Sequence, residues 1–325
     1  MVLVIGGSGF VGSVLIKKLN NSNIRNLDKN QSPFYKDITT IGDIQNKNQI
    51  TIPKGTESVV LLAAEHRDDV SPRSLYYDVN VKGTKNVLDV MDEAGVKNLI
   101  FTSSVAVYGL NKDNPDENHI QDPFNHYGKS KWKAELVIKD WYEKDPHNKS
   151  VNIIRPTVIF GERNRGNVYN LFEQISSGHF MLVGSGLNKK SMAYVGNIVS
   201  FIISRLEASD PGYHIYNYAD KPDYSMIELV HIIQRKMDIK QSSIKIPYFF
   251  GLLAGYGFDI ISFLIRRNLK ISSVRVKKFC ATTQFDATKA YNVFKPPYKL
   301  EHAINKTLEY EFINSKDDDV LFYTE

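Results

Sequence analysis

Residues 2–12 read VLVIGGSGFVG, a short apolar run followed at once by closely spaced glycines. The apolar run predicts a buried parallel strand, and the apolar spacing of residues 14–19 predicts a helix directly behind the glycines. Gly6, Gly9 and Gly12 allow the backbone to approach a pyrophosphate, which binds to the free N–H groups at the start of a helix. A glycine loop can also serve as a simple turn, but between a strand and a helix it predicts a dinucleotide-binding site.

Apolar strands and helical stretches alternate through the first half of the chain. Further strands are expected at residues 24–27, 59–64, 99–102 and 153–161, and a helical pattern covers residues 80–88. This alternation predicts an α/β fold with a Rossmann-type, doubly wound parallel sheet.

The length of the chain, 325 residues, suits two lobes. We expect a dinucleotide-binding Rossmann domain that carries the catalytic residues at 1–165 and a smaller, mainly substrate-binding lobe at 166–325. Within this second part, a stretch at about 190–220 is expected to return to the Rossmann sheet.

The composition excludes several classes of protein. Hydrophobic residues make up 42% of the chain and charged residues 24%, which is usual for a soluble globular protein. The net charge of +5 is mild, and no run of like charges forms a nucleic-acid-binding arm. The single cysteine, Cys280, excludes an internal disulfide framework and fits a reducing compartment. No basic stretch precedes the apolar start and no apolar run reaches the roughly 20 residues of a spanning helix, so we expect a cytoplasmic protein.

Asp28 stands at the end of the second expected strand. A carboxylate there can accept hydrogen bonds from both ribose hydroxyls and repels a 2′-phosphate, which favours NAD over NADP; the alternative is that Asp28 only opens a turn. We expect Asp43 and Ile44 near the adenine. The small side chains of Ala63 and Ala64 indicate that the chain passes close to a bound cofactor.

Tyr127 and Lys131 are four residues apart and share one face of a helix. An ammonium beside a phenol favours the phenolate, so we expect Lys131 to lower the pKa of Tyr127 from its usual value of about 10. Tyr127 can then act as a general base, while Ser104 hydrogen-bonds the same substrate oxygen. The same spacing also occurs on solvated helix faces, so the assignment depends on the neighbouring segments.

Residues 65–69 form a dense charged loop just past the strand expected at 59–64, where ligands bind in open α/β sheets. His66 in this loop has two interpretations. It is either a metal-binding or catalytic residue, or an ordinary polar loop residue. We favour the polar position and expect no metal site.

In their order along the chain, these segments resemble the extended short-chain dehydrogenase/reductase family, in its nucleotide-sugar epimerase branch. The shared motifs are the glycine turn, Asp28, Asp43, Ala63-Ala64, Asn80-x-x-Gly83-Thr84, Ser103-Ser104, Tyr127-x-x-x-Lys131 and Arg155-Pro156. The resemblance covers essentially the whole chain. Residues 64–72, 74–80 and 161–167 are closely similar to bacterial O-antigen enzymes that epimerise N-acetylglucosamine-pyrophosphoryl-undecaprenol at C4.

This resemblance implies a set of site residues and NAD as the cofactor. The implied catalytic residues are Ser104, Tyr127 and Lys131. The implied cofactor-binding residues are Gly6, Gly9, Phe10, Val11, Gly12, Asp28, Asp43, Ile44, Ala63, Ala64, Asn80, Ser103, Tyr127, Lys131 and Pro156. The implied substrate-binding residues are His66, Arg67, Arg163, Arg165, Asn167, Lys190, Arg275 and Thr283.

Several of the implied substrate-binding residues have the positive charge that binding a pyrophosphate requires. Arg163 and Arg165 can each pair with one, or can be ordinary surface arginines. Lys190 stands where the family usually has an arginine on the substrate pyrophosphate, and Asn197 replaces the usual aspartate. A lysine is a point charge rather than a bidentate fork, which argues against ordinary recognition of a UDP-sugar. Thr283 is small and would leave room for an N-acetyl group.

The resemblance implies that N-acetylglucosamine and N-acetylgalactosamine are interconverted on undecaprenyl pyrophosphate, for O-antigen or lipopolysaccharide synthesis. The alternatives are a UDP-N-acetylglucosamine 4-epimerase, a nucleotide-sugar 4-ketoreductase and a non-enzymatic NAD-sensing scaffold. A 4,6-dehydratase is disfavoured because Val105 and Ala106, rather than an acidic residue, follow Ser104. Helices beside the active site often form dimers in this family, so a homodimer is a further option.

Residues 246–258 carry no charge, and residues 260–265 are apolar except for Ser262. Cations then follow without an acid: Arg266, Arg267, Lys270, Arg275, Lys277 and Lys278. One interpretation is a buried helical hairpin of the substrate lobe. The other is an interfacial patch that contacts lipid headgroups beside a basic rim, at the cytoplasmic face of the inner membrane. Residues 316–319 are polar and give no functional signal.

Overall fold

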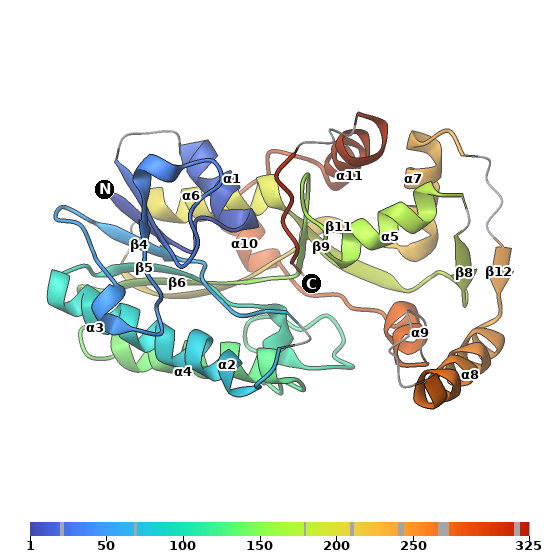
Figure 1. The fold of residues 1–325 in the computed structure, drawn as a ribbon, viewed down its shortest axis with the longest axis horizontal. Coiled ribbons are helices and arrows are strands. Elements are labelled where there is room, and N and C mark those ends of the chain that lie inside the picture. Colours follow the sequence, from blue (N-terminus) through green and yellow to red (C-terminus); the bar gives the residue numbers. More distant parts are fainter. Residues whose placement is uncertain are drawn as a thin grey trace.

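The structure is a computed structural model that describes residues 1–19, 23–67, 70–178, 180–208, 211–239, 244–265, 273–314 and 319–324. A seven-stranded parallel sheet forms its centre, in the order β10-β6-β5-β4-β1-β2-β3 (Figure 1). Its strands are β1 (Val2–Ile5), β2 (Ile24–Asp28), β3 (Thr39–Ile41), β4 (Ser58–Leu61), β5 (Asn98–Thr102), β6 (Ser150–Pro156) and β10 (Gly212–Tyr218). This strand order is doubly wound, so the predicted Rossmann-type fold is confirmed.

Helices cover both faces of this sheet (Figure 1). On one face α1 (Phe10–Leu19) packs against α6 (Val195–Ala208), and on the other α3 (Thr84–Ala94) packs against α4 (His126–Tyr142). A short α2 (Ser74–Tyr77) and a π-helical turn, η3 (Asp78–Gly83), precede α3. Neighbouring side chains of a strand enter different cores, Val4 on one face and Leu3 on the other, which explains the uninterrupted apolar runs.

The remaining elements build a second lobe beside the sheet. Its strands are β7 (Val158–Phe160), β8 (Met181–Val183), β9 (Lys189–Tyr194), β11 (Asp220–Ser225) and β12 (Ile244–Ile246). They form a sheet of order β11-β9-β7 and a pair, β12-β8. Its helices are α5 (Asn167–Ser176), α7 (Met226–Lys236), α8 (Tyr248–Ile265), α9 (Ser273–Cys280) and α11 (Leu300–Leu308). The helix α10 (Thr288–Val293) instead packs against β10 of the central sheet. Short helical turns lie at η1 (Lys36–Ile38), η2 (Lys47–Gln49), η4 (Val105–Tyr108) and η5 (Glu309–Ile313).

The prediction of one continuous strand at residues 153–161 is wrong. β6 ends at Pro156, and Thr157 donates its backbone N–H to the Tyr218 carbonyl at 3.0 Å. The chain then leaves the central sheet, and β7 pairs with β9 in the second lobe. The apolar run therefore crosses from one lobe to the other, and both parts are strands because each is paired in its own sheet.

A buried ion pair fixes α4 to the sheet. Arg155 donates to the Glu135 carboxylate from Nε at 3.0 Å and from Nη2 at 2.6 Å, and both side chains are buried. Arg155 Nη1 also donates to the Tyr108 hydroxyl at 2.7 Å, and this hydroxyl donates to Asn217 at 2.7 Å. The pair thus connects the helix that carries Tyr127 to three other segments.

We expect Glu135→Ala to lower the free energy of unfolding by about 3–5 kcal/mol, because it leaves the Arg155 guanidinium buried without a counter-ion. Chemical denaturation measures this change. The matched control is Glu301→Ala, since Glu301 pairs with Arg235 at 3.6 Å on the surface; its cost should not exceed about 1 kcal/mol. Equal losses in the two variants would contradict a dominant role for the buried pair.

Candidate active site

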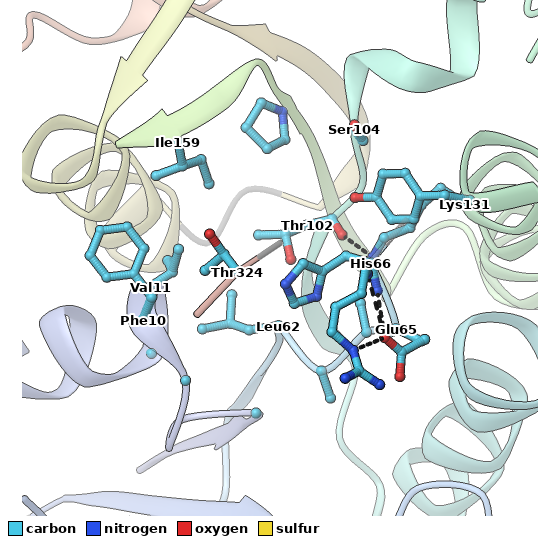
Figure 2. A pocket seen from close by; sticks show the side chains of 18 of the residues that line it. Phe10, Val11, Leu62, Glu65, His66, Thr102, Ser104, Lys131, Ile159 and Thr324 are labelled. Atoms are coloured by element: carbon cyan, nitrogen blue, oxygen red, sulfur yellow. Dashed lines mark hydrogen bonds and ion pairs between the residues drawn. The ribbon is translucent and has the colours of Figure 1, made fainter. Parts of the chain in front are cut away.

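A cleft of about 1140 Å³ lies at the carboxyl edge of the central sheet, between the glycine turn and the second lobe (Figure 2). Most single-ligand pockets measure about 300–1,000 Å³, so this cleft has room for a cofactor and a substrate together. The predicted cofactor residues that line it are Gly6, Gly9, Phe10, Val11, Gly12, Asp28, Asp43, Ile44, Ala63, Ala64, Ser103, Tyr127, Lys131 and Pro156.

The glycine turn packs so closely that side chains are excluded at two of its positions. Gly6 has a φ of +91°, and a Cβ there would lie 2.4 Å from the backbone N of Ala63. A Cβ on Gly12 would lie 2.4 Å from the Cα of Gly7. The helix α1 begins at Phe10, so Gly12 lies in its first turn, and Figure 2 shows Phe10 and Val11 of the same turn on the cleft wall. Free N–H groups at a helix start suit a pyrophosphate.

Asp28 ends β2 at the same wall. Its Oδ2 accepts the N–H of Ser8 at 3.0 Å and its Oδ1 accepts the N–H of Asn30 at 2.9 Å. A carboxylate offers about four acceptor sites, so capacity remains for a ribose diol. The two oxygens of Asp43 likewise accept one hydrogen bond each, both from Gln45, at 2.9 and 3.1 Å. Together the turn and Asp28 fit the adenosine and pyrophosphate parts of NAD.

The structure brings Ser104, Tyr127 and Lys131 to one wall of the cleft. Asn125 caps α4 by accepting the N–H of Gly128 at 2.8 Å, which places Tyr127 in the first turn and Lys131 one turn later. Ser104 caps η4, where its Oγ accepts the N–H of Ala106 at 3.1 Å and keeps its own hydrogen for donation. A hydrogen bond joins Ser104 to the Tyr127 hydroxyl.

We predicted that Lys131 lowers the pKa of Tyr127, and in the ligand-free protein this prediction is wrong. Burial raises the pKa of Tyr127 to about 12, although the hydrogen bond from Ser104 acts in the opposite direction. Burial also lowers the pKa of Lys131 to about 7. The Lys131 amine donates to the Thr102 carbonyl at 2.8 Å, as Figure 2 shows, and lies 4.7 Å from the centre of the Phe101 ring. Desolvation therefore outweighs any attraction between the two groups.

Asn80, predicted to bind the cofactor, does not line the cleft. Its amide donates to Ser130 Oγ at 2.8 Å and to the Glu65 carbonyl at 2.9 Å, and its Oδ1 accepts the N–H of Glu65 at 2.8 Å. Asn80 thus holds the loop after β4 against α4. The helical pattern predicted for residues 80–88 does not identify these partners.

The loop after β4 does reach the cleft, through His66 and Arg67. The Glu65 carboxylate accepts a hydrogen bond from Arg67 Nε at 3.4 Å (Figure 2). Desolvation in the cleft lowers the pKa of His66, which favours the neutral imidazole; this form can accept a hydrogen bond from a sugar hydroxyl or donate one to it. His66 and Arg67 remain predicted substrate residues.

Arg163 and Arg165 lie outside the cleft lining, and other parts of the chain already pair with them. Arg163 forms an ion pair with Asp319 at 2.9 Å, and Arg165 forms one with Glu311 at 2.7 Å. These partners lie more than a hundred positions away along the chain, so no local pattern identifies them. In contrast, Asn167 lines the cleft as predicted.

Lys190 also lies outside the cleft lining, and its amine donates to the Ala281 carbonyl at 2.6 Å. Burial lowers its pKa to about 8. Its strand neighbour Ser191 lines the cleft, as does the predicted Thr283, which forms a parallel bridge with Lys190. The side chain of Arg275 lies outside the described residues. Sequence reasoning missed cleft residues that belong to no motif, among them Thr157, Ser191, Phe285 and residues 321–324.

The fold and the cleft define a Rossmann-type α/β protein with a serine, a tyrosine and a lysine at a dinucleotide site. The chain belongs to the 3-beta hydroxysteroid dehydrogenase/isomerase family, whose model matches residues 3–248. A relative from Escherichia coli O157:H7, N-acetyl-alpha-D-glucosaminyl-diphospho-ditrans,octacis-undecaprenol 4-epimerase, is 59% identical over 327 residues, which cover 100% of this chain and 99% of the relative. The resemblance to such enzymes is thereby confirmed.

Two solved structures share the fold. UDP-N-acetylglucosamine 4-epimerase from Bacillus cereus matches with a TM-score of 0.73 and 17% identity, over 94% of this chain and 97% of that chain. MoeE5 in complex with UDP-glucose and NAD matches with a TM-score of 0.72 and 21% identity, over 95% of this chain and 97% of that chain.

Proposed function

We propose that this protein is an NAD-dependent 4-epimerase that interconverts N-acetylglucosamine and N-acetylgalactosamine on undecaprenyl pyrophosphate. The observation that carries the proposal is that Ser104, Tyr127 and Lys131 meet on the wall of the cleft that the glycine turn opens. The relative with 59% identity over the whole chain supports the choice of reaction and carrier.

Each catalytic side chain of the cleft has a separate role in the reaction at C4 of the sugar. Tyr127 takes the proton of the 4-hydroxyl, and Ser104 donates a hydrogen bond that orients the same oxygen. Lys131, with a pKa of about 7, changes its charge near neutral pH and can balance the proton held by the phenol. When bound, NAD supplies a reversible hydride acceptor, and its cationic ring favours ionisation of a nearby phenol. Both epimers must fit, so the pyrophosphate is their common anchor.

Purified protein should be incubated with N-acetylglucosamine on undecaprenyl pyrophosphate and, separately, with UDP-N-acetylglucosamine. We expect the galacto epimer from the lipid-linked sugar and little or none from the nucleotide sugar. Conversion of the nucleotide sugar alone would refute the proposed carrier. Stoichiometric formation of NADH from added NAD, with a 4-keto sugar as the product, would instead identify a 4-ketoreductase running in reverse, and no conversion of either sugar would favour a sensing scaffold.

A second part of the proposal concerns the membrane. α8 carries large apolar side chains on its outer face, with Phe249 67%, Leu253 59% and Ile260 62% exposed. Their spacing of four and seven residues places them on one side of the helix. The buried side holds glycine: a Cβ on Gly251 would lie 2.3 Å from Val183 Cγ1. The interpretation of these residues as a buried hairpin is therefore wrong.

This apolar face of α8 lies at the far end of the second lobe, beside α9 (Figure 1). Lys277 of α9 donates to the Tyr256 hydroxyl at 3.1 Å, which places a cation at its rim. None of the helices among the described residues has the length and apolar character to cross a bilayer. We therefore infer that α8 inserts its apolar face into the headgroup region at the cytoplasmic side of the inner membrane, where the lipid-linked sugar resides.

A further inference from the structure

We propose that residues 319–324 form a strap that closes the cofactor cleft, and that Phe322 retains NAD by holding this strap on the glycine turn. This inference rests on the proposed function only in that NAD is the group retained. Figure 1 shows the C-terminal segment running down between the two lobes to the centre of the molecule.

Backbone hydrogen bonds dock the strap on the loop that follows β7. The N–H of Phe322 donates to the Arg163 carbonyl at 2.9 Å, and the Phe322 carbonyl accepts the N–H of Arg165 at 2.8 Å. The hydroxyl of Thr324 donates to Asn164 Oδ1 at 2.7 Å. These three hydrogen bonds hold Phe322 and Thr324 against the loop. Residues 321–324 thereby form part of the cleft wall.

Ion pairs reinforce this docking from both sides. Arg163 pairs with Asp319 at the start of the strap, and Arg165 pairs with Glu311 in the preceding turn. Glu311 is buried and its Oε1 also accepts the backbone N–H of Arg163 at 2.6 Å. Arg163 itself has a φ of 73°, a conformation that non-glycine residues adopt rarely, which indicates that its surroundings hold this loop firmly. The two arginines that the sequence assigned to substrate phosphates thus serve the strap.

The aromatic ring of the strap connects two walls of the cofactor site. The Phe322 ring centre lies 6.0 Å from that of Phe10, the first residue of α1, and 6.3 Å from that of Phe34, in the segment after Asp28. Both distances are within the range of favourable aromatic contacts. Figure 2 shows Thr324 projecting into the cleft near Val11. The strap therefore borders the part of the cleft where the helix N-terminus suits a pyrophosphate.

An epimerase needs its cofactor to stay bound between the two hydride transfers. After C4 has been oxidised, loss of the reduced cofactor would leave a keto sugar that cannot be returned to either epimer. A strap that joins the glycine turn to the second lobe must detach before the cofactor can leave. The barrier to that detachment includes the contacts of Phe322 and the ion pair of Asp319.

The test compares NAD dissociation from the full chain and two variants, without any sugar. NAD-loaded protein is diluted into an enzyme that destroys free NAD, and the NAD that remains bound is measured over time. We expect Phe322→Ala to accelerate dissociation at least tenfold and Asp319→Asn to accelerate it less. The matched control is Phe124→Ala, since Phe124 is an aromatic residue that is 53% exposed and lies outside the cleft lining; its rate should stay within twofold of the original.

A second readout guards against a folding defect in Phe322→Ala. Chymotrypsin cleaves after aromatic residues, and Tyr323 is such a site in both chains. We expect NAD to protect the original chain, but not Phe322→Ala, from cleavage after Tyr323, while the thermal unfolding of the two proteins without NAD stays alike. Equal dissociation rates in all proteins would overturn the strap while leaving the epimerase proposal intact. Absence of NAD binding by the original chain would overturn both.

Discussion

Replacing Tyr127 with phenylalanine should abolish epimerisation and leave the fold intact. The change removes one hydroxyl and keeps the ring that packs in the cleft wall, so only the proton acceptor is lost. A positioned general base contributes about 10²–10⁴-fold to a rate, so kcat should fall by at least a hundredfold. Chromatographic separation of the gluco and galacto products measures kcat, and circular dichroism with thermal unfolding reports on the fold.

The matched control for this variant is Tyr142→Phe. Tyr142 lies at the other end of α4 and donates its hydroxyl to the Pro146 carbonyl at 3.2 Å near the surface. Its loss should change kcat by less than twofold. If Tyr127→Phe kept more than a tenth of the activity, Tyr127 would not be the base, and Lys131 would be the next residue to test because burial lowers its pKa to about 7.

A double substitution on α8, Phe249→Glu with Leu253→Glu, should eliminate binding to vesicles of anionic phospholipid. Burial of each apolar side chain contributes about 1.5–3 kcal/mol, so the loss of two lowers the affinity by at least a hundredfold. Cosedimentation with vesicles measures the affinity. Activity on a short-chain, water-soluble analogue of the lipid-linked sugar should be unchanged, since neither residue lines the cleft.

The control for α8 is Ile120→Glu, which introduces the same charge at an apolar side chain that is 79% exposed on the loop before α4. This variant should bind vesicles like the original chain. Vesicle binding by the double variant at the original affinity would contradict the membrane role of α8 but would not affect the assignment of the reaction.

The central sheet could be predicted because its signals are local. A strand buried on both faces requires an apolar run, and the turn after β1 requires glycine at Gly6 and Gly12, where a Cβ would collide with the backbone. The carboxyl ends of parallel strands share one edge, so the position of Ser104 at that edge follows from the alternation of elements. An apolar run alone does not reveal that β6 ends at Pro156 and that the next residues, as β7, pair with β9 in the second lobe.

The parts that could not be predicted depend on partners distant in sequence or on burial. Arg163 and Arg165 had the charge for a phosphate, but their carboxylate partners, Asp319 and Glu311, follow no pattern that links them. The orientation of α8 depends on Gly251, whose small size lets the helix pack on β8 with its large residues outward. The raised pKa of Tyr127 results from desolvation of its hydroxyl in the cleft wall, which a pentapeptide pattern does not reveal.

The fate of the hydrogen on C4 is the most direct test of the proposed epimerase mechanism. N-Acetylglucosamine labelled with deuterium at C4 and linked to undecaprenyl pyrophosphate is incubated with the purified protein, and the galacto product is analysed by mass spectrometry. Because the hydrogen removed from one face of C4 is the one returned to the other, the product should retain deuterium at C4 without net formation of NADH. Loss of the deuterium to solvent, or turnover only with added NADH, would contradict the proposed epimerase.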